Sequence, residues 1–349
     1  MSKSDVLLIS SSRFIDHETP TGHPEQPARA MVMTRVAERW RSTGGRVVEP
    51  TPVETVALAR VHQETYLAEI ASTDGRRVQL DPDTYTSPET EVVARLAAGA
   101  AVSGVSYAVE KQSPAVAFVR PPGHHAESGR AMGFCLYNNA SIAAAHALSL
   151  GLKRVAVIDY DVHHGNGIQE IFYEDARVLY VSTHQYPFYP GTGAASEVGR
   201  GQGLGATVNI PLEAGAGDAD LDLVFRDVVL PVVGSFQPEL VVVSAGFDAH
   251  AEDPLGGMRL STEGFATLTG RLFKFAVEQC ESRFVLVTEG GYNLTALESC
   301  LESTLEVISS NLPDNLDPIR GATEVARAAL GAVGRAQASY WPALARLPR

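Results

Sequence analysis

The chain has 349 residues, of which 45% are hydrophobic and 20% charged, a composition ordinary for a globular protein and unlike a fibrous or disordered one. Its net charge of −13 argues against a nucleic-acid partner, because phosphate binding depends on clustered Lys and Arg. Three cysteines are too few for a disulfide framework, and we find neither a signal-peptide pattern nor an apolar stretch approaching ~18 residues, so we expect a cytoplasmic protein without a membrane segment.

Short apolar runs rich in β-branched residues recur along the chain and alternate with longer amphipathic stretches. Runs of four to six residues that are apolar on both faces are typical of strands buried on both sides of a parallel sheet. In chain order, the predicted strands are 5–10, 115–119, 155–158, 178–182, 206–210, 240–244 and 284–287.

Helical periodicity appears in two of the intervals between these strands. Apolar residues recur there at the three- and four-residue steps of a helix; they are Leu221, Val224, Phe225 and Val228, and then Phe265, Leu268, Leu272 and Phe275. Asp218 is the predicted N-cap of the first helix, and Ser261 or Thr262 that of the second. Alternating strands and helices predict a doubly wound α/β fold. No linker divides the chain, so we expect residues 1–349 to form one domain.

Four of the predicted strands lead directly into polar clusters. In chain order, the clusters are Arg120-Pro-Pro-Gly-His124-His125, Asp159-Tyr-Asp161-Val-His163, Ala-Gly-Phe-Asp248 and Thr-Glu-Gly-Gly-Tyr292. Ligands of open α/β sheets bind beyond the carboxyl ends of the strands, so the four clusters can converge on one pocket.

The second cluster has the spacing of a metal site. In an extended segment Asp159, Asp161 and His163 share a face, and Asp248 can add a ligand from another strand end. Three protein ligands with an open position are typical of catalytic zinc. A helix-capping aspartate beside an ordinary hydrogen-bonded histidine is the weaker alternative, because three further clusters accompany this one.

The remaining clusters offer groups for proton transfer and for oxyanion stabilisation. His124 and His125 suit proton transfer better than joint ligation of one ion, and Asp159 and Asn166 are their candidate partners. The glycines before Tyr292 can carry its phenol into a pocket, where it can donate to a developing oxyanion. Taken alone, a Gly-Gly-Tyr segment is more often an ordinary turn.

Together these motifs resemble the arginase–deacetylase superfamily, and within it the histone deacetylases, bacterial deacetylase-like amidohydrolases and acetylpolyamine amidohydrolases. The resemblance spans roughly His23 to Leu294 and is carried, in family order, by RPPGHHA, GFCLYNN, DYDVHHGNG, YPGTG, SAGFDAHAEDPLGG and EGGYNL. It implies a three-layer αβα fold with a mostly parallel sheet of about eight strands.

The resemblance also implies a role for each site residue. One Zn²⁺ ion is expected on Asp161, His163 and Asp248, because the carboxylates that arginase-like relatives use for a second metal are missing here. The tandem His124 and His125 are expected at the catalytic water, with His125 as general base, and Tyr292 on the substrate carbonyl. Asp159 would support His124. Asn166 would support His125, as in the class II branch.

A substrate tunnel follows from the same resemblance. Its expected wall comprises Phe134, Tyr189 and the Gly133 carbonyl, and Asp81 and Asp83 resemble an acidic loop at the entrance, although a solvated turn explains those two equally well. Leu255 occupies the place where polyamine-specific relatives carry a Glu, and so favours acyl-lysine. A structural K⁺ ion is expected near Asp159, Asp161, His163, Ser182 and Thr183.

The predicted function is zinc-dependent hydrolysis of an acyl amide, with the acetyl-lysine side chain of a peptide or protein, or a similar N-acetylated primary amine, as the substrate. An acetylpolyamine amidohydrolase is the alternative, and a non-catalytic zinc or acyl-ligand binding module is a remote one. We expect no nucleic-acid or membrane partner. A homo-oligomer is compatible with the sequence.

Overall fold

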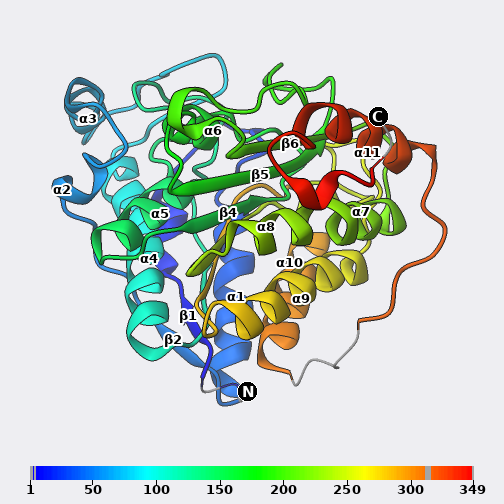
Figure 1. Cartoon of the computed structure of the whole chain (residues 1–349). Helices are drawn as coiled ribbons and strands as arrows, with labels where there is room; N and C mark the ends of the chain where they lie inside the picture. Colours follow the sequence, from blue (N-terminus) through cyan, green and yellow to red (C-terminus); the bar gives the residue numbers. More distant parts are fainter. Residues whose placement is uncertain (1–2, 4, 311–315, 348–349) are drawn as a thin grey trace.

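Within the described residues (3, 5–310 and 316–347), eight strands of the computed structural model form one parallel sheet (Figure 1). Their order across the sheet is β2-β1-β3-β8-β7-β4-β5-β6. The strands are β1 (Leu7–Ile9), β2 (Arg46–Val48), β3 (Ala115–Ala117), β4 (Val155–Asp159), β5 (Val178–Gln185), β6 (Thr207–Leu212), β7 (Leu240–Ala245) and β8 (Phe284–Thr288). The predicted α/β fold with about eight parallel strands is confirmed.

Helices cover both faces of this sheet. They are α1 (Ala28–Ser42), α2 (Thr55–Leu58), α3 (Glu64–Ala71), α4 (Thr90–Lys111), α5 (Asn139–Ser149), α6 (Asn166–Phe172), α7 (Asp218–Val224), α8 (Leu230–Phe236), α9 (Thr262–Gln279), α10 (Leu294–Ser309) and α11 (Glu324–Gln337). One π-turn (Phe225–Val229) joins α7 to α8, and short 3-10 turns occur at Ser12–Asp16, Gly201–Gly203 and Pro342–Leu344.

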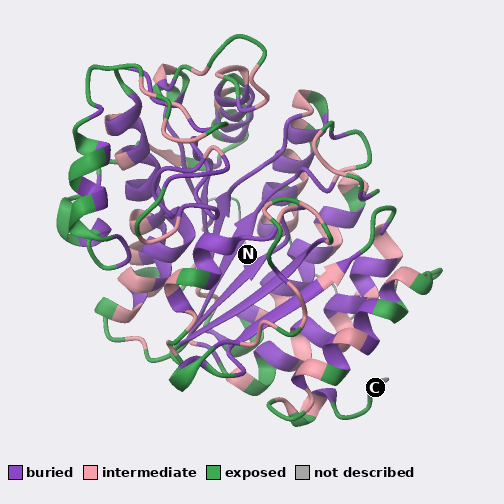
Figure 2. Ribbon diagram, turned by 90° about the horizontal axis from the view of Figure 1, so that it is seen from above, coloured by how far each residue is buried: buried purple, intermediate pink, exposed green. Residues whose placement is uncertain are grey.

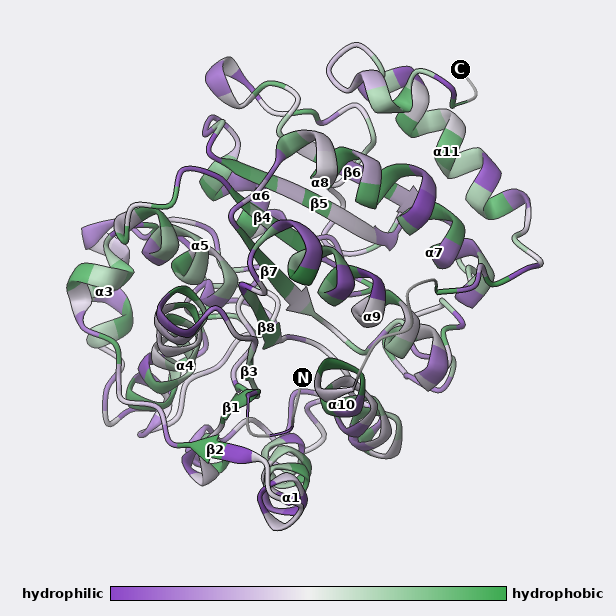
Figure 3. Cartoon of the chain, turned by 60° about the horizontal axis from the view of Figure 1, so that its bottom comes forward, coloured by the Kyte–Doolittle hydropathy of each residue, from purple (hydrophilic) through white to green (hydrophobic). Residues whose placement is uncertain are grey.

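Successive strand residues point into two apolar cores, one on each face. Along β7, Val241 and Val243 join the core shared with α1 and α7–α11, whereas Leu240 and Val242 join the core shared with α2–α6. The sheet is buried between these layers in Figure 2, and its central strands are hydrophobic along their length in Figure 3. Burial on both faces explains why continuous apolar runs, rather than alternating ones, mark the strands.

Two details of the predicted elements need correction. Strand β2 was not predicted, because its three partly exposed residues at the sheet edge make no apolar run. Asp218 is the first residue of α7 and not its N-cap, which is Gly217. The Asp218 carboxylate instead accepts hydrogen bonds from the backbone and side chain of Ser261. Ser261 is confirmed as the N-cap of α9, since its Oγ accepts from the Gly264 amide.

Helix α4 is long and apolar enough to span a membrane by length and composition, which we did not expect from the sequence. Yet 61% of its most apolar window is buried inside the protein. A Cβ at Gly99 would lie 1.9 Å from the Thr51 carbonyl oxygen, and one at Gly104 would lie 3.2 Å from Val285. Such close packing is what a core helix of a folded domain requires.

The four strands that lead into polar clusters are consecutive neighbours in the middle of the sheet, in the order β3-β8-β7-β4. Because all four are parallel, their carboxyl ends lie at the same edge. The sheet order therefore brings together segments that lie up to about 170 residues apart in the chain.

Candidate active site

Asp161, His163 and Asp248 form a compact buried group at this edge. One potential ligand atom from each residue lies within 4.8 Å of the others, and it is the one metal-ligand group of this kind among the described residues. Nδ1 of His163 lies 3.1 Å from Oδ1 of Asp161 and 3.2 Å from Oδ2 of Asp248. Two carboxylate oxygens and one imidazole nitrogen are a donor set that suits a divalent metal.

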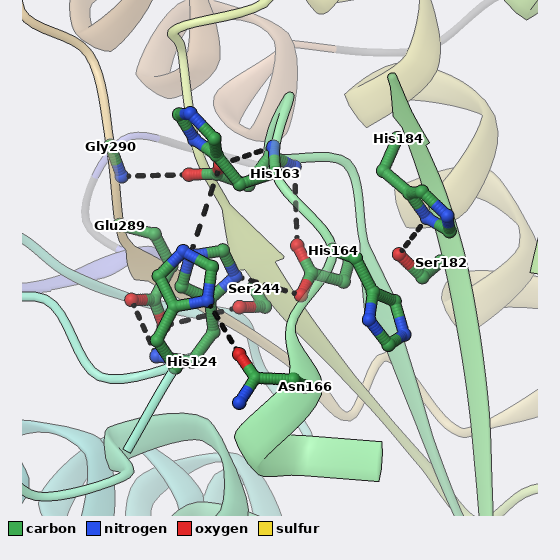
Figure 4. A network of polar contacts seen from close by, with 12 residues as sticks. His124, His163, His164, Asn166, Ser182, His184, Ser244, Glu289 and Gly290 are labelled. Carbon is green, nitrogen blue, oxygen red and sulfur yellow. Dashed lines mark hydrogen bonds and ion pairs between the residues drawn. The ribbon is translucent and has the colours of Figure 1, made fainter. Parts of the chain in front are cut away.

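Two glycines make room for these carboxylates. A Cβ at Gly246 would lie 1.9 Å from Oδ2 of Asp161, and one at Gly290 would lie 2.1 Å from Oδ2 of Asp248. The Gly290 amide also donates to Asp161 Oδ2 at 3.0 Å, a contact shown in Figure 4. Glycine is therefore required at both positions if the two carboxylates are to face each other.

Without a bound cation, the group carries concentrated charge. Burial opposes protonation of His163, but its hydrogen bonds with Asp161 and Asp248 outweigh burial and raise its pKa to about 10. Burial and the neighbouring Asp161 charge raise the pKa of Asp248. One proton therefore compensates charge where a metal ion would otherwise do so.

The tandem histidines have partners of different charge. Nδ1 of His124 lies 3.1 Å from Oδ2 of Asp159, and Nδ1 of His125 lies 2.8 Å from Oδ1 of Asn166. Burial opposes protonation of His124, but the carboxylates of Asp161 and Asp159 raise its pKa to about 10. Burial, with His124 and His163 nearby, lowers the pKa of His125 well below its usual value. The pair thus combines a cationic and a neutral imidazole.

Glu289 holds the loop that carries these histidines, a role that we did not foresee from the sequence. Its Oε2 accepts from the backbone amides of Gly123 (2.5 Å) and His124 (3.1 Å), and its Oε1 accepts from Ser244 Oγ. Figure 4 shows Glu289 reaching the loop from the end of β8. The sequence feature that could have indicated this role is a carboxylate directly after a buried strand, within the Glu-Gly-Gly-Tyr segment.

Tyr292 follows strand β8 and lines a cavity together with His125 and His163. Burial raises the pKa of its phenol well above the ordinary value, so the hydroxyl keeps its proton. The guanidinium of Arg29 lies 5.0 Å from the ring centroid, and it donates to the backbone carbonyls of Glu289 and Gly291. Arg29 is buried and was also missed in the sequence analysis, since it lies about 260 residues from these partners.

A cavity of about 220 Å³ opens above these groups. Its floor includes His125, His163 and Tyr292. The structure brings most of the predicted tunnel residues to its wall, and the wall residues are Asp83, Gly133, Phe134, Phe188, Tyr189 and Leu255. Phe188 was not predicted, although it stacks on the His163 ring at a centroid distance of 5.4 Å.

Of the two predicted acidic residues, Asp83 meets Gly133 at this wall. Oδ1 of Asp83 accepts from the Gly133 amide at 3.2 Å. Asp81 does not line the cavity, and its Oδ1 accepts from the Asp83 amide. A Cβ at Gly133, whose φ is +57°, would lie 2.4 Å from the His125 ring. The Gly133 carbonyl accepts from the Cys135 thiol at 3.2 Å.

Two of the residues expected around K⁺, Asp161 and His163, belong to the metal-ligand group itself, and the others lie on β4 and β5. Asp159 of β4 is paired in register with Ser182 of β5. Ser182 Oγ contacts His184 Nδ1, and Thr183 Oγ1 is buried without a hydrogen-bond partner. His164 turns away from the metal-ligand group in Figure 4 and contacts Thr192 and Gln169.

Comparison with known proteins identifies the family. A family model described as the histone deacetylase domain matches residues 23–308. This chain belongs to the histone deacetylase family. A probable deacetylase of Archaeoglobus fulgidus is 37% identical over 90% of this chain and 88% of its own length. Histone deacetylase 15 of Arabidopsis thaliana is 37% identical over 98% of this chain and 62% of its own length.

A solved histone deacetylase structure confirms the fold. The crystal structure of the HDA15 HD domain superposes with a TM-score of 0.89 at 34% identity, covering 97% of this chain and 98% of that one. The sequence resemblance to the deacetylases is thereby confirmed at the level of both family and fold. Membership in this family supports deacetylase activity, which is a hydrolysis, and the buried Asp/His group fits the metal dependence of the family.

Proposed function

We propose that this protein is a zinc-dependent deacetylase that removes acetyl groups from lysine side chains. One observation carries the proposal: His163 of the buried two-carboxylate, one-imidazole group, His125 of the histidine pair and the protonated Tyr292 line the same 220 Å³ cavity. Metal ligands, proton-transfer groups and an oxyanion donor are the parts that amide hydrolysis requires.

Asp161, His163 and Asp248 would hold the zinc ion. Three protein ligands leave a coordination position open, as in catalytic zinc sites. When bound, the ion supplies Lewis acidity toward the acyl carbonyl and acidifies a water molecule. The two carboxylates and the imidazole leave the site near neutral, which suits a single divalent ion. The family resemblance also implies K⁺ near Ser182, and we retain that as part of the proposal.

The residues of this chain would divide the proton transfers. His125 is neutral, and its Nδ1 contacts Asn166, so its Nε2 is free to take a proton from the attacking water and pass it to the leaving amine. His124, cationic beside Asp159, stabilises developing negative charge. The Tyr292 hydroxyl donates to the oxygen of the former carbonyl.

The cavity wall supports an acyl-lysine substrate. Phe134, Phe188 and Leu255 offer apolar surface to the methylene chain of a lysine, and Asp83 lies where a substrate amide or amine would enter. An acetylpolyamine remains the second candidate. The Asp83 carboxylate favours it, since a polyamine carries additional cationic amines, whereas an apolar Leu255 does not.

The test is acetate release by purified, metal-analysed protein from an acetyl-lysine peptide, acetylputrescine and acetylspermidine. We expect about one zinc per chain, inhibition by a hydroxamate, and the highest kcat/KM on the peptide. Higher kcat/KM on acetylspermidine, lost in an Asp83→Asn variant, would establish the polyamine alternative. Zinc binding without acetate release from any of the three would instead indicate a binding module.

A further inference from the structure

A chain of polar contacts runs from the cavity floor to the protein surface behind His125. Oδ1 of Asn166 lies 2.8 Å from His125 Nδ1, and Nδ2 of the same amide donates to Oε1 of Glu127 at 2.8 Å. Glu127 is then paired with Arg130, whose side chain is 60% exposed. Neither Glu127 nor Arg130 lines the cavity.

The contact with Glu127 determines which way the Asn166 amide faces. The two ends of an asparagine amide have nearly the same shape, so only hydrogen-bond partners distinguish the oxygen from the nitrogen. A carboxylate accepts hydrogen bonds and cannot donate one. If the amide were reversed, its oxygen would face the Glu127 oxygen at about hydrogen-bond distance, with no proton between them. Figure 4 shows the observed arrangement, with the Asn166 oxygen on the histidine contact and its nitrogen turned away.

The orientation of the amide in turn sets the tautomer of His125. Facing an amide oxygen, His125 must carry its proton on Nδ1, which leaves a lone pair on Nε2. Facing an amide nitrogen, His125 would have to present the Nδ1 lone pair and carry its proton on Nε2. Only the first tautomer can accept a proton in the cavity.

We infer that Glu127 is a positioning residue for the reaction, acting through Asn166 to hold His125 in the tautomer that serves as base. The inference rests on the proposed function for its catalytic consequence. It does not apply to His124, because the Asp159 carboxylate offers an acceptor in either orientation. A neutral partner needs a second group to orient it, and a charged partner does not.

The other neighbours of Asn166 are weaker candidates for this task. Met132 Sδ lies 3.3 Å from Asn166 Nδ2, but a thioether is only a weak acceptor. Arg130 touches Glu127 and not Asn166, and its exposed ion pair contributes little. Among the described contacts, the strong acceptor for the amide nitrogen is Glu127.

Helix α6 offers a matched control, a second glutamate that contacts the loop of Glu127. The Glu170 carboxylate accepts from the backbone and hydroxyl of Ser128, next to Glu127, and these side-chain hydrogen bonds do not involve the Asn166 side chain. Glu170→Ala therefore loosens the same turn without exposing the amide. Glu127→Gln is the conservative variant, because its side-chain oxygen can still accept from Asn166.

The experiment is a double-mutant cycle on the zinc-loaded enzyme with an acetyl-lysine peptide. We expect Glu127→Ala to lower kcat about tenfold with little change in KM, and Glu127→Gln to restore most of the loss. In an Asn166→Asp background the partner of His125 needs no orientation, so Glu127→Ala should there cost nothing, or raise activity by removing a like charge. Equal losses from Glu127→Ala in both backgrounds would mean a structural role and overturn the inference. Glu170→Ala should have the same small effect in both.

A second readout does not depend on activity. The ¹⁵N resonances of selectively labelled histidine report the tautomer of His125. We expect the Nδ1–H form in the wild type and in Glu170→Ala, and a shift toward Nε2–H in Glu127→Ala. An unchanged Nδ1–H form in Glu127→Ala would overturn the inference, whether or not the wild type releases acetate. A wild type that releases no acetate would count only against the proposed function.

Discussion

Oδ2 of Asp253 accepts a hydrogen bond from the backbone amide of Tyr292 at 2.6 Å, and a second from the amide of Asn293 at 3.0 Å. Its other oxygen accepts from the Leu255 amide at 3.0 Å. The buried Asp253 carboxylate thus joins the segment of Leu255, at the cavity wall, to the segment of Tyr292. The position of the Tyr292 hydroxyl therefore depends on a residue that does not line the cavity.

For Asp253→Asn we expect kcat to fall by on the order of tenfold with zinc content unchanged. Both carboxylate oxygens of Asp253 accept from backbone N–H groups, whereas the NH₂ end of an asparagine side chain cannot accept, so one of these hydrogen bonds would be lost. Steady-state kinetics with metal analysis measure this effect. In a Tyr292→Phe background the same substitution should have little further effect. A full additional loss there would show that Asp253 does not act through Tyr292.

For Tyr292→Phe we expect kcat to fall by about 10²–10³, the usual cost of losing one oxyanion donor. The ring contacts with Phe134 and Arg29 are kept in this variant, so the fold and the zinc content should not change. Kinetics on an acetyl-lysine peptide, with circular dichroism as control, provide the check. Wild-type turnover in the variant would exclude the phenol from the reaction.

Metal binding should release protons. Since the pKa of His163 is raised to about 10 without metal, the imidazole is protonated at pH 7.5, and ligation must displace that proton. We therefore expect zinc uptake to release at least about one proton and zinc affinity to rise as pH rises. Calorimetry of the metal-free protein in buffers with different ionisation enthalpies measures this release. Binding heats independent of the buffer would contradict it.

Leu255→Glu should change substrate preference. A carboxylate at the cavity wall would attract the extra amines of acetylspermidine and repel an acidic peptide. We expect the ratio of kcat/KM for acetylspermidine to that for an acetyl-lysine peptide to rise by at least about tenfold, or ~1.4 kcal/mol. Leu255→Gln controls for polarity without charge. If both variants changed the ratio equally, charge would not be the cause.

Stability should fall in mild acid because of His62. Burial lowers its pKa to about 4, and its two ring nitrogens contact the Glu127 carbonyl and the Asn138 amide. As pH falls through 6.5, His62 takes up a proton in the unfolded chain but not in the folded chain. His62 therefore stabilises the fold above pH 6.5, and this contribution is lost between about pH 6.5 and 4. Over that range the free energy of unfolding should fall by roughly 3 kcal/mol. The stability advantage of wild type over His62→Gln, measured by urea unfolding, should shrink over this range. A constant difference would contradict the expectation.

Much of the fold could be predicted because local patterns carry it. A strand buried on both faces must be apolar at every position, and 155–158 and 240–244 show this without reference to the rest of the chain. The three residues of β2 carry no such signal, because an edge strand buries little. Asp218 is a residue type that often caps helices, but its carboxylate is bound instead by Ser261, the N-cap of another helix.

By itself, the sequence determined the family, the parallel sheet and the segments that carry the site, because a strand followed by Asp-x-Asp-x-His or His-His is a local pattern. Only the tertiary structure decided which groups hold these residues in place. Glu289, Arg29, Asp253 and Glu127 contact partners 39 to about 260 residues away in the chain, on segments that only the folded sheet and its helices bring together. Hydrogen bonds between residues so far apart leave no recognisable spacing pattern in the sequence. They form only when the packing of the two cores brings the strand ends together.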